Sequence, residues 1–399
     1  MQQRRENPAL PKALVFAIVY LAYVTNYVNR LNLTMASPQM RADGILSTEQ
    51  LGLMGSVFSV IYACGRLING ALSDRLSPRK MICGGLVLMA AASITISFLP
   101  PFPGLVLLWG VNAYAESMQW SSALHAVSTV YAGPKAKKMT SFLATSVATG
   151  NLIGILLSTV LISKGSVKLA FLVPGLLAVA MAVAAWSVLR QITAPLPVSN
   201  GKRTSIGGLF RDRGLQLALI PSLLHGVIKD NVSLFMTAFF VDRYAVDLEA
   251  SAMFVLFVPL LGLLGRLVYT PIYQLCRQRE HRVSILCFIV CLLASATLLF
   301  GGVGPVLAAV CLSLLYAGTS MVNTSMVSIF PLPYAENGNL ALVSGIIDFS
   351  VYGGAALGSA VFGLVIGRTG SYAPMFAAWA AVSVLSLVVL FYMERPKKQ

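Results

Sequence analysis

The chain has 399 residues, of which 57% are hydrophobic and 11% charged, and its mean hydropathy is +0.78. This composition excludes an ordinary soluble protein and is typical of a polytopic membrane protein. A formal net charge of +15 would suggest nucleic-acid binding in a soluble chain. Here the basic residues lie between apolar runs, which is typical of loops at a membrane surface. We therefore expect the lipid bilayer, and not nucleic acid, as the partner.

Twelve apolar runs follow one another along the chain, and each is long enough to cross a bilayer as a helix, for which about 20 residues suffice. Residues 47–50 (STEQ) predict a capping box that opens the second helix, and the proline-rich residues 100–103 close the third. The sequence thus predicts an all-α membrane protein with twelve transmembrane helices. The predicted runs are residues 13–38, 49–73, 80–99, 104–131, 140–163, 168–190, 214–241, 250–275, 283–301, 305–330, 338–366 and 371–392.

Lysine and arginine residues orient these helices, because they are enriched in cytoplasmic loops. Of the 29, 20 lie in alternate segments that include both chain ends, 5 lie in the opposite segments and 4 within the runs. Both termini are therefore expected in the cytoplasm and the protein in the cytoplasmic (inner) membrane. The first run follows Arg4, Arg5 and Lys12 without a small-residue cleavage site, which favours a retained helix over a signal peptide.

The first run contains an arginine near its far end. Tyr23, Tyr27 and Arg30 follow at steps of four and three, so they share one helical face. A charge at the bilayer centre costs about 2.5–3.5 kcal/mol and needs a partner or a water-filled cavity. A guanidinium framed by tyrosines can bind a carboxylate or phosphate; alternatively, Arg30 extends to the outer interface. Three further cations lie within the runs: Arg66, Lys229 and Arg266.

The second run ends in a basic turn. Residues 65–80 read GRLINGALSDRLSPRK, and the third run begins directly after them. We expect Gly70 to let a neighbouring helix approach closely. Asp74, Arg75 and Arg79 are candidates for a gate motif on the cytoplasmic side.

Three acidic residues lie inside the runs, away from their ends: Glu116, Asp230 and Asp348. A carboxyl group in apolar surroundings binds a proton more readily than in water, so each is a candidate for proton coupling. The alternative is structural pairing, of Asp230 with Lys229 and of Glu116 with Asn112.

One long polar stretch, residues 191–213, is rich in proline and basic residues and predicts a cytoplasmic linker. It separates an N-terminal six-helix bundle, residues 1–190, from a C-terminal one, residues 214–399. A Gly-Arg pair at 265–266, followed by a basic turn, repeats the plan of residues 65–80. Such an internal repeat is typical of secondary transporters with a central site between the halves.

No nucleophile lies near a candidate base, no nucleotide-binding loop is present, and the six cysteines show no metal-ligand spacing. We therefore expect no enzyme activity, no cofactor and no metal.

The turn at 65–80 resembles the loop between the second and third helices of the major facilitator superfamily of secondary transporters. The first helix, with Tyr23, Tyr27, Arg30 and Asn32, resembles the organophosphate:phosphate antiporters and the related anion:cation symporters. The resemblance implies two pseudo-symmetric six-helix bundles and an arginine, here Arg30, that binds the substrate's anionic group. Residues at or near the positions of the family's other site residues complete the candidate substrate-binding set. This set is Arg30, Tyr23, Tyr27, Arg66, Trp120, His125, His225, Lys229 and Tyr352.

The departures from this pattern bear on the substrate. His125 and His225 stand where relatives carry arginine, and Asn29 stands where the symporters commonly carry an acid. Losing a fixed guanidinium weakens the case for a dianionic phosphate ester, so a carboxylate or a singly charged anion becomes more plausible.

The sequence thus favours a secondary active transporter for a small organic anion, namely a carboxylate, a sugar acid or a phosphate ester. Protons or inorganic phosphate are the candidate counter-substrates, and a monomer is expected. Two alternatives stay open: an efflux facilitator for hydrophobic compounds, in which Arg30 is structural, and a transporter-shaped sensor that binds without transport.

Overall fold

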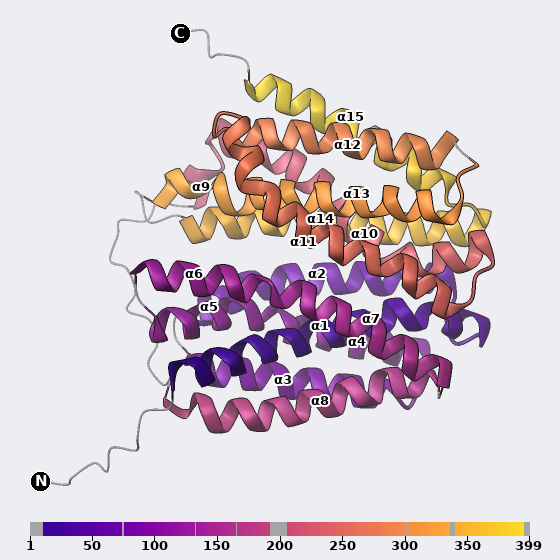
Figure 1. Ribbon diagram of the computed structural model, residues 1–399, viewed down its shortest axis with the longest axis horizontal. Coiled ribbons are helices and arrows are strands. Elements are labelled where there is room, and N and C mark those ends of the chain that lie inside the picture. The colour runs from indigo at the N-terminus through magenta and orange to yellow at the C-terminus, as the bar shows by residue number, and fades with distance from the viewer. Residues whose placement is uncertain are drawn as a thin grey trace, which may run out of the picture.

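The computed structural model describes residues 11–73, 76–131, 133–164, 166–191, 206–300, 302–335 and 340–394. Helices make up nearly all of this part of the chain, and it contains no strand (Figure 1). The predicted fold class, an all-α membrane protein, is therefore confirmed. The described chain begins and ends on the same side of the molecule (Figure 1), here called the proximal side; the opposite side is the distal side.

The first half of the chain forms one bundle, in which α1 packs against α7 and α8, and α3 packs against α4 and α8. Its helices are α1 Lys12–Ala42, α2 Thr48–Ser73, α3 Pro78–Ile96, α4 Phe102–Ser117, α5 Gln119–Val130, α6 Gly133–Ala144, α7 Ser146–Lys164 and α8 Val167–Val188, followed by the 3₁₀ turn η1 Leu189–Gln191.

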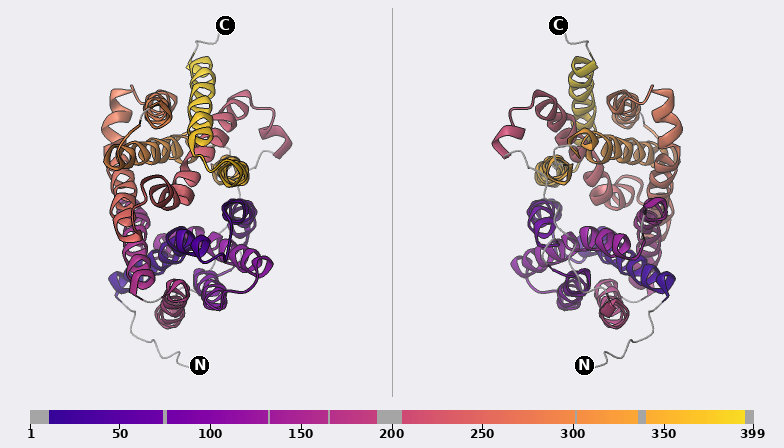
Figure 2. Two further views of the ribbon diagram at one scale, coloured as in Figure 1. Left: turned by 90° about the vertical axis from the view of Figure 1, so that its right-hand side faces the viewer. Right: turned by 90° about the vertical axis from the view of Figure 1, so that its left-hand side faces the viewer.

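The second half forms the other bundle, in which α10 packs against α13 and α14, and α12 packs against α15. It comprises α9 Ile206–Leu209, α10 Arg213–Tyr244, α11 Leu248–Leu275, α12 Glu280–Phe300, α13 Pro305–Asn323, the π-helix η2 Thr324–Ile329, the 3₁₀ turn η3 Leu332–Ala335, α14 Leu340–Thr369 and α15 Ala373–Glu394. Figure 2 shows the two bundles facing each other. Most of the predicted linker, residues 192–205, lies outside the described residues.

Ten helices of the described chain are long and apolar enough to cross a membrane. The two other predicted spans are the α4–α5 pair, which is interrupted at Met118, and α10, which carries Lys229 and Asp230 in its middle. Large apolar side chains remain exposed on the outer helices, for example Val183 on α8 and Val388 on α15. In a bilayer such side chains contact lipid, so their exposure fits the membrane class.

Local sequence signals mark the starts of two helices, and the first of these was predicted. The Ser47 hydroxyl accepts a hydrogen bond from the Gln50 backbone at 3.2 Å, and the Gln50 side chain accepts one from the Ser47 backbone at 2.8 Å. This is the predicted capping box before α2. Pro78 is the first residue of α3, where its missing N–H costs nothing, and Ser77 caps the helix.

Three pairs of helices form most of the contact between the bundles: α2 with α14, α7 with α11, and α1 with α10. The closest approach is between α2 and α14, where a Cβ added at Gly52 would lie 2.6 Å from the Cα of Gly363. Small residues let the two backbones come this near. The bundles therefore meet along these three pairs of helices, with the site described next between them.

Candidate functional site

A cavity of about 110 Å³ lies between the two bundles, lined by side chains from both. This space holds several water molecules or a small ligand. Five of the residues predicted to form the site line it, namely Tyr27, Arg30, Lys229, Asp230 and Tyr352.

Arg30 of α1 points into this cavity, and its side chain is 18% exposed. Its guanidinium lies 3.8 Å from the Glu116 carboxylate of the same bundle and 4.0 Å from the Asp230 carboxylate of the other. Neither distance is that of a hydrogen bond. Among the described residues no group forms a hydrogen bond with Arg30, so its N–H donors face the cavity. The alternative of an arginine extending to the membrane interface does not fit this placement.

Aromatic rings surround the same guanidinium. Its carbon lies 4.8 Å from the centre of the Phe58 ring, 5.2 Å from that of Tyr62 and 5.8 Å from that of Tyr27. Such contacts stabilise a desolvated cation by about 2 kcal/mol or more without using its N–H donors. The rings therefore hold Arg30 in the cavity and leave it able to bind an anion.

A second cation lines the cavity from the other bundle. Lys229 of α10 lies 3.4 Å from the carboxylate of Asp230, the next residue. One oxygen of Asp230 and one of Glu116 are buried without a hydrogen bond from a described residue. Two cations and two carboxylates thus meet at the centre of the molecule, so the group is neutral overall when all four are charged.

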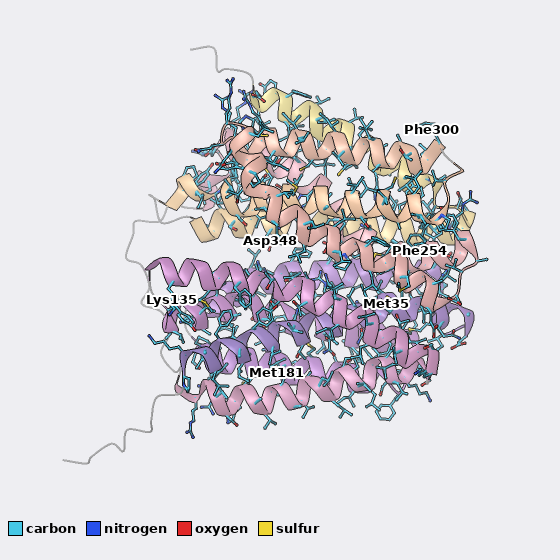
Figure 3. All side chains as sticks on the ribbon, in the orientation of Figure 1. Met35, Lys135, Met181, Phe254, Phe300 and Asp348 are labelled. Atoms are coloured by element: carbon cyan, nitrogen blue, oxygen red, sulfur yellow. The ribbon has the colours of Figure 1, made fainter. Side chains whose placement is uncertain are left out.

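Arg66 and Asp348, both predicted site residues, pair with each other and do not line the cavity. Nη2 and Nε of Arg66 on α2 lie 3.0 and 3.1 Å from the Asp348 carboxylate on α14. Figure 3 shows Asp348 where the two bundles face each other. The pair joins the bundles on the proximal side of the cavity.

The other predicted aromatic residues lie beside the cavity. Trp120 packs against Tyr23, with ring centres 5.1 Å apart, and Tyr23 packs against Tyr27 at 5.4 Å. Tyr352, which lines the cavity, packs against Tyr62 of the other bundle at 4.6 Å. Tyr27 and Tyr352 thus form part of the cavity wall, and Tyr23 and Trp120 pack behind Tyr27.

Neither predicted histidine lines the cavity. His125 is buried on α5, and His225 is buried on α10, where its Nε2 lies 3.3 Å from the side-chain oxygen of Asn323. Asn112 likewise donates to Glu116 at 2.8 Å and Gln119 to the Ile82 backbone at 3.2 Å. His225 thus connects α10 to α13 and Gln119 connects α5 to α3, whereas Asn112 and Glu116 both belong to α4.

The gate motif is partly described. Asp74 and Arg75 lie outside the described residues. The guanidinium of Arg79 stacks on the Trp186 ring at 3.7 Å, which joins α3 to α8. A Cβ at Gly65 would lie 2.9 Å from the Ser117 Cβ, whereas one at Gly70 would meet no described atom within 4 Å. The tight crossing is therefore nearer the middle of α2.

Several cavity residues were not predicted. Trp109 lies in the apolar stretch of residues 104–111, so its sequence surroundings do not distinguish it from lipid-facing residues. Tyr316, Thr34 and Ser233 carry isolated hydroxyls in apolar runs, which is a weak signal for a polar cavity. Among the described residues no group of three or more His, Cys, Asp or Glu side chains could hold a metal ion.

At the distal side a second ion pair joins the bundles. Arg41 at the end of α1 donates to both oxygens of Asp242 near the end of α10, at 2.8 and 3.0 Å. The Tyr372 hydroxyl donates to the same carboxylate at 2.7 Å, and Arg41 also donates to the Thr48 hydroxyl at 3.2 Å. This bidentate pair joins the distal ends of α1 and α10.

A two-bundle helical membrane fold with a charged central cavity is the architecture of a secondary transporter. A family model described as Major Facilitator Superfamily matches residues 19–339, and the chain belongs to this family. Membership confirms the expectation of a transporter and not an enzyme.

Curated relatives match parts of the chain. A probable hexose phosphate transport protein of Chlamydia trachomatis is 26% identical over 167 residues, 42% of this chain and 37% of that protein. The membrane sensor protein UhpC of Salmonella typhimurium is 28% identical over 102 residues, 26% of this chain and 23% of the sensor. A probable sulfoacetate transporter of Cupriavidus necator is 27% identical over 113 residues, 28% of this chain and 26% of that protein. The matched stretches thus span well under half of each relative.

A solved structure of the nucleoside transporter NupG superposes with a TM-score of 0.76 at 12% identity, covering 96% of this chain and 100% of NupG. This similarity shows the shared fold alone. The phosphate-ester transporters among the relatives confirm the resemblance to the organophosphate:phosphate antiporter branch.

Proposed function

We propose that the chain is a secondary carrier that moves a small organic anion across the inner membrane, with Arg30 binding the anionic group. This proposal rests on the placement of Arg30, which faces the cavity between the bundles and forms no hydrogen bond with any described residue. A guanidinium in such a place binds a carboxylate or phosphate by two parallel hydrogen bonds.

The number of cations supports a substrate with one anionic group. Arg30 and Lys229 are the cations among the described residues that line the cavity, and Arg66 is paired with Asp348. His225 lies outside the cavity wall and supplies no third positive group there. Carboxylates, sugar acids and phosphate esters that carry a single anionic group fit this arrangement, in agreement with a relative named for hexose phosphate.

The neutral set of four charges suggests how transport is coupled. An anion that enters the cavity adds one negative charge to the otherwise neutral group of Arg30, Lys229, Glu116 and Asp230. A proton taken up by Glu116 or Asp230 would restore the balance, and buried uncompensated charge is costly in a membrane. Symport of a proton is therefore the favoured coupling, and exchange for inorganic phosphate is the alternative.

Alternating access then requires the bundles of residues 1–190 and 214–399 to rock about the cavity as two units of one monomer. In this arrangement the Arg41–Asp242 pair holds the distal side closed, and opening that side breaks it.

Counterflow in proteoliposomes tests the proposal. Vesicles loaded with unlabelled glycerate or glycerol 3-phosphate should accumulate the labelled anion transiently from outside if the protein is a carrier. The similarity to a membrane sensor protein favours one second candidate, and binding of these anions without counterflow would support that sensor role instead.

A further inference from the structure

The cavity continues from Arg30 toward the distal side, beyond the charged residues. Helices α1, α7 and α10 all run from the proximal to the distal side, so residues later in each lie further in that direction. Thr34 is one helical turn, about 6 Å, beyond Arg30. Ser233 is likewise one turn beyond Lys229, and all of these residues line the cavity.

Two hydroxyls in this distal part lack a hydrogen bond to any described residue, whereas those of Ser59 and Ser359 donate to protein atoms. Threonine and serine within a helix commonly donate to the carbonyl one turn back, as Thr159 does to Ile155 at 2.8 Å. Thr34 and Ser233 form no side-chain hydrogen bond with any described residue, although Thr34 is only 5% exposed. Both hydroxyls face the cavity from opposite bundles.

Asn151 of α7 adds an amide to the same region. It lines the cavity, is 9% exposed, and its side chain forms no hydrogen bond with a described residue. Polar groups buried to this degree are normally hydrogen-bonded. Thr34, Asn151 and the half-buried Ser233 therefore indicate a ligand or water in the cavity that completes their hydrogen bonds.

Apart from the hydrogen-bonded Ser59 and Ser359, the remaining wall of this distal part is largely apolar. Leu33, Ile155 and Met236 line it, and both cations of the cavity wall, Arg30 and Lys229, lie nearer its middle. A second charged group on the substrate would find no partner there and would lose its hydration. The chemistry of the wall thus fits an uncharged group that carries hydroxyls.

We propose that Thr34, Asn151 and Ser233 bind the uncharged end of the transported anion, and that this end is hydroxylated. The substrate is then a hydroxy acid or polyol phosphate with one anionic group at Arg30 and hydroxyls directed to the distal side. This inference rests on the proposed function. It specifies the chemistry of the uncharged end of the substrate, which Arg30 does not select.

Matched probes test it on the purified full-length protein in detergent. Binding of glycerate is compared with that of propionate, and glycerol 3-phosphate with propyl phosphate, by calorimetry. We expect the hydroxylated member of at least one pair to bind about tenfold more tightly or better, because a site built to hydrogen-bond a hydroxyl rejects the analogue without it. Malonate, with its second carboxylate, should bind more weakly than glycerate.

Thr34→Val, which keeps the side-chain shape and removes the hydroxyl, should reduce the preference for the hydroxylated probe about fivefold or more and leave the deoxy probe unaffected. Thr159→Val, which lies outside the cavity, is the matched control. Ser233→Ala gives the same test if Thr34→Val does not fold.

Equal binding of hydroxylated and deoxy probes to the wild-type protein, or an unchanged preference in both cavity variants, would overturn this inference and leave the anion-carrier function standing. Failure of every probe to bind would overturn the proposed function itself. The two failures are therefore distinguishable.

Discussion

At the scale of single residues, the central cavity combines two cations with two carboxylates, and Glu116 is the one of these that lies deepest in the protein. It is 1% exposed, its Oε1 accepts from Asn112, and its Oε2 faces Arg30 at 3.8 Å. A proton on this oxygen would release Arg30 from the carboxylate and strengthen anion binding. Binding should therefore increase as the pH falls.

Glu116→Gln removes the titratable group but keeps a side chain of the same size beside Asn112. We expect this variant to retain anion exchange in counterflow and to lose accumulation driven by an inward proton gradient, because only the latter requires a proton to be carried. Uptake into proteoliposomes with and without an imposed pH gradient separates the two activities. Gradient-driven accumulation at the wild-type level would exclude Glu116 as the coupling residue and leave Asp230 or Asp348.

Part of this site could be predicted from the sequence. The spacing of Tyr23, Tyr27 and Arg30 placed them on one face, and the structure places Tyr27 and Arg30 on the cavity wall. The pairing of Arg66 with Asp348 could not be predicted, since the two are 282 residues apart and nothing local links them. The tertiary structure determines which intramembrane charges pair across the bundles.

At the scale of helices, the spans were predicted to within a few residues, because apolar length and turn chemistry determine them locally. The interruption at Met118 between α4 and α5, and the π-helix η2 after α13, were not predicted. Neither segment contains a proline or glycine, but Pro331 follows η2 and cannot donate a helical hydrogen bond to the Val327 carbonyl. The hydroxyl of Ser344 on α14 donates to this carbonyl instead, at 2.7 Å.

Two adjacent glycines of α14 give a test of helix packing. A Cβ at Gly354 would lie 2.8 Å from the Leu223 carbonyl carbon of α10, whereas one at Gly353 would meet nothing within 4 Å. Gly354→Ala should therefore lower the thermal unfolding temperature by several degrees, because backbone cannot move aside cheaply. Gly353→Ala is the matched control and should leave that temperature nearly unchanged. Similar unfolding temperatures for the two variants would contradict the packing of α14 on α10.

At the scale of the whole molecule, the Arg41–Asp242 pair links the distal ends of the two bundles. A solvent-accessible pair contributes up to about 1 kcal/mol, enough to change a ratio of two conformations about fivefold. Asp242→Asn should therefore increase the population open on the distal side.

A cysteine in place of Ser233, in a background without other reactive cysteines, reports that opening through its labelling by a membrane-impermeant maleimide. We expect faster labelling in Asp242→Asn. In the doubly reversed variant Arg41→Asp with Asp242→Arg, labelling should return toward the original rate. Identical rates in all three proteins would show that the pair does not control access.

The most direct test of the account is the affinity of the protein for glycerol 3-phosphate and glycerate when Arg30 is replaced, measured by calorimetry. Arg30→Gln should weaken binding about a hundredfold, since charged hydrogen bonds contribute about 1.5–3 kcal/mol each, and Arg30→Lys should recover part of the affinity because it keeps the charge but loses the bidentate geometry. Arg368→Gln, at the exposed end of α14, should bind as the wild type does. An Arg30→Gln protein that is folded and binds these anions with wild-type affinity would contradict the assignment of Arg30 as the anion-binding residue.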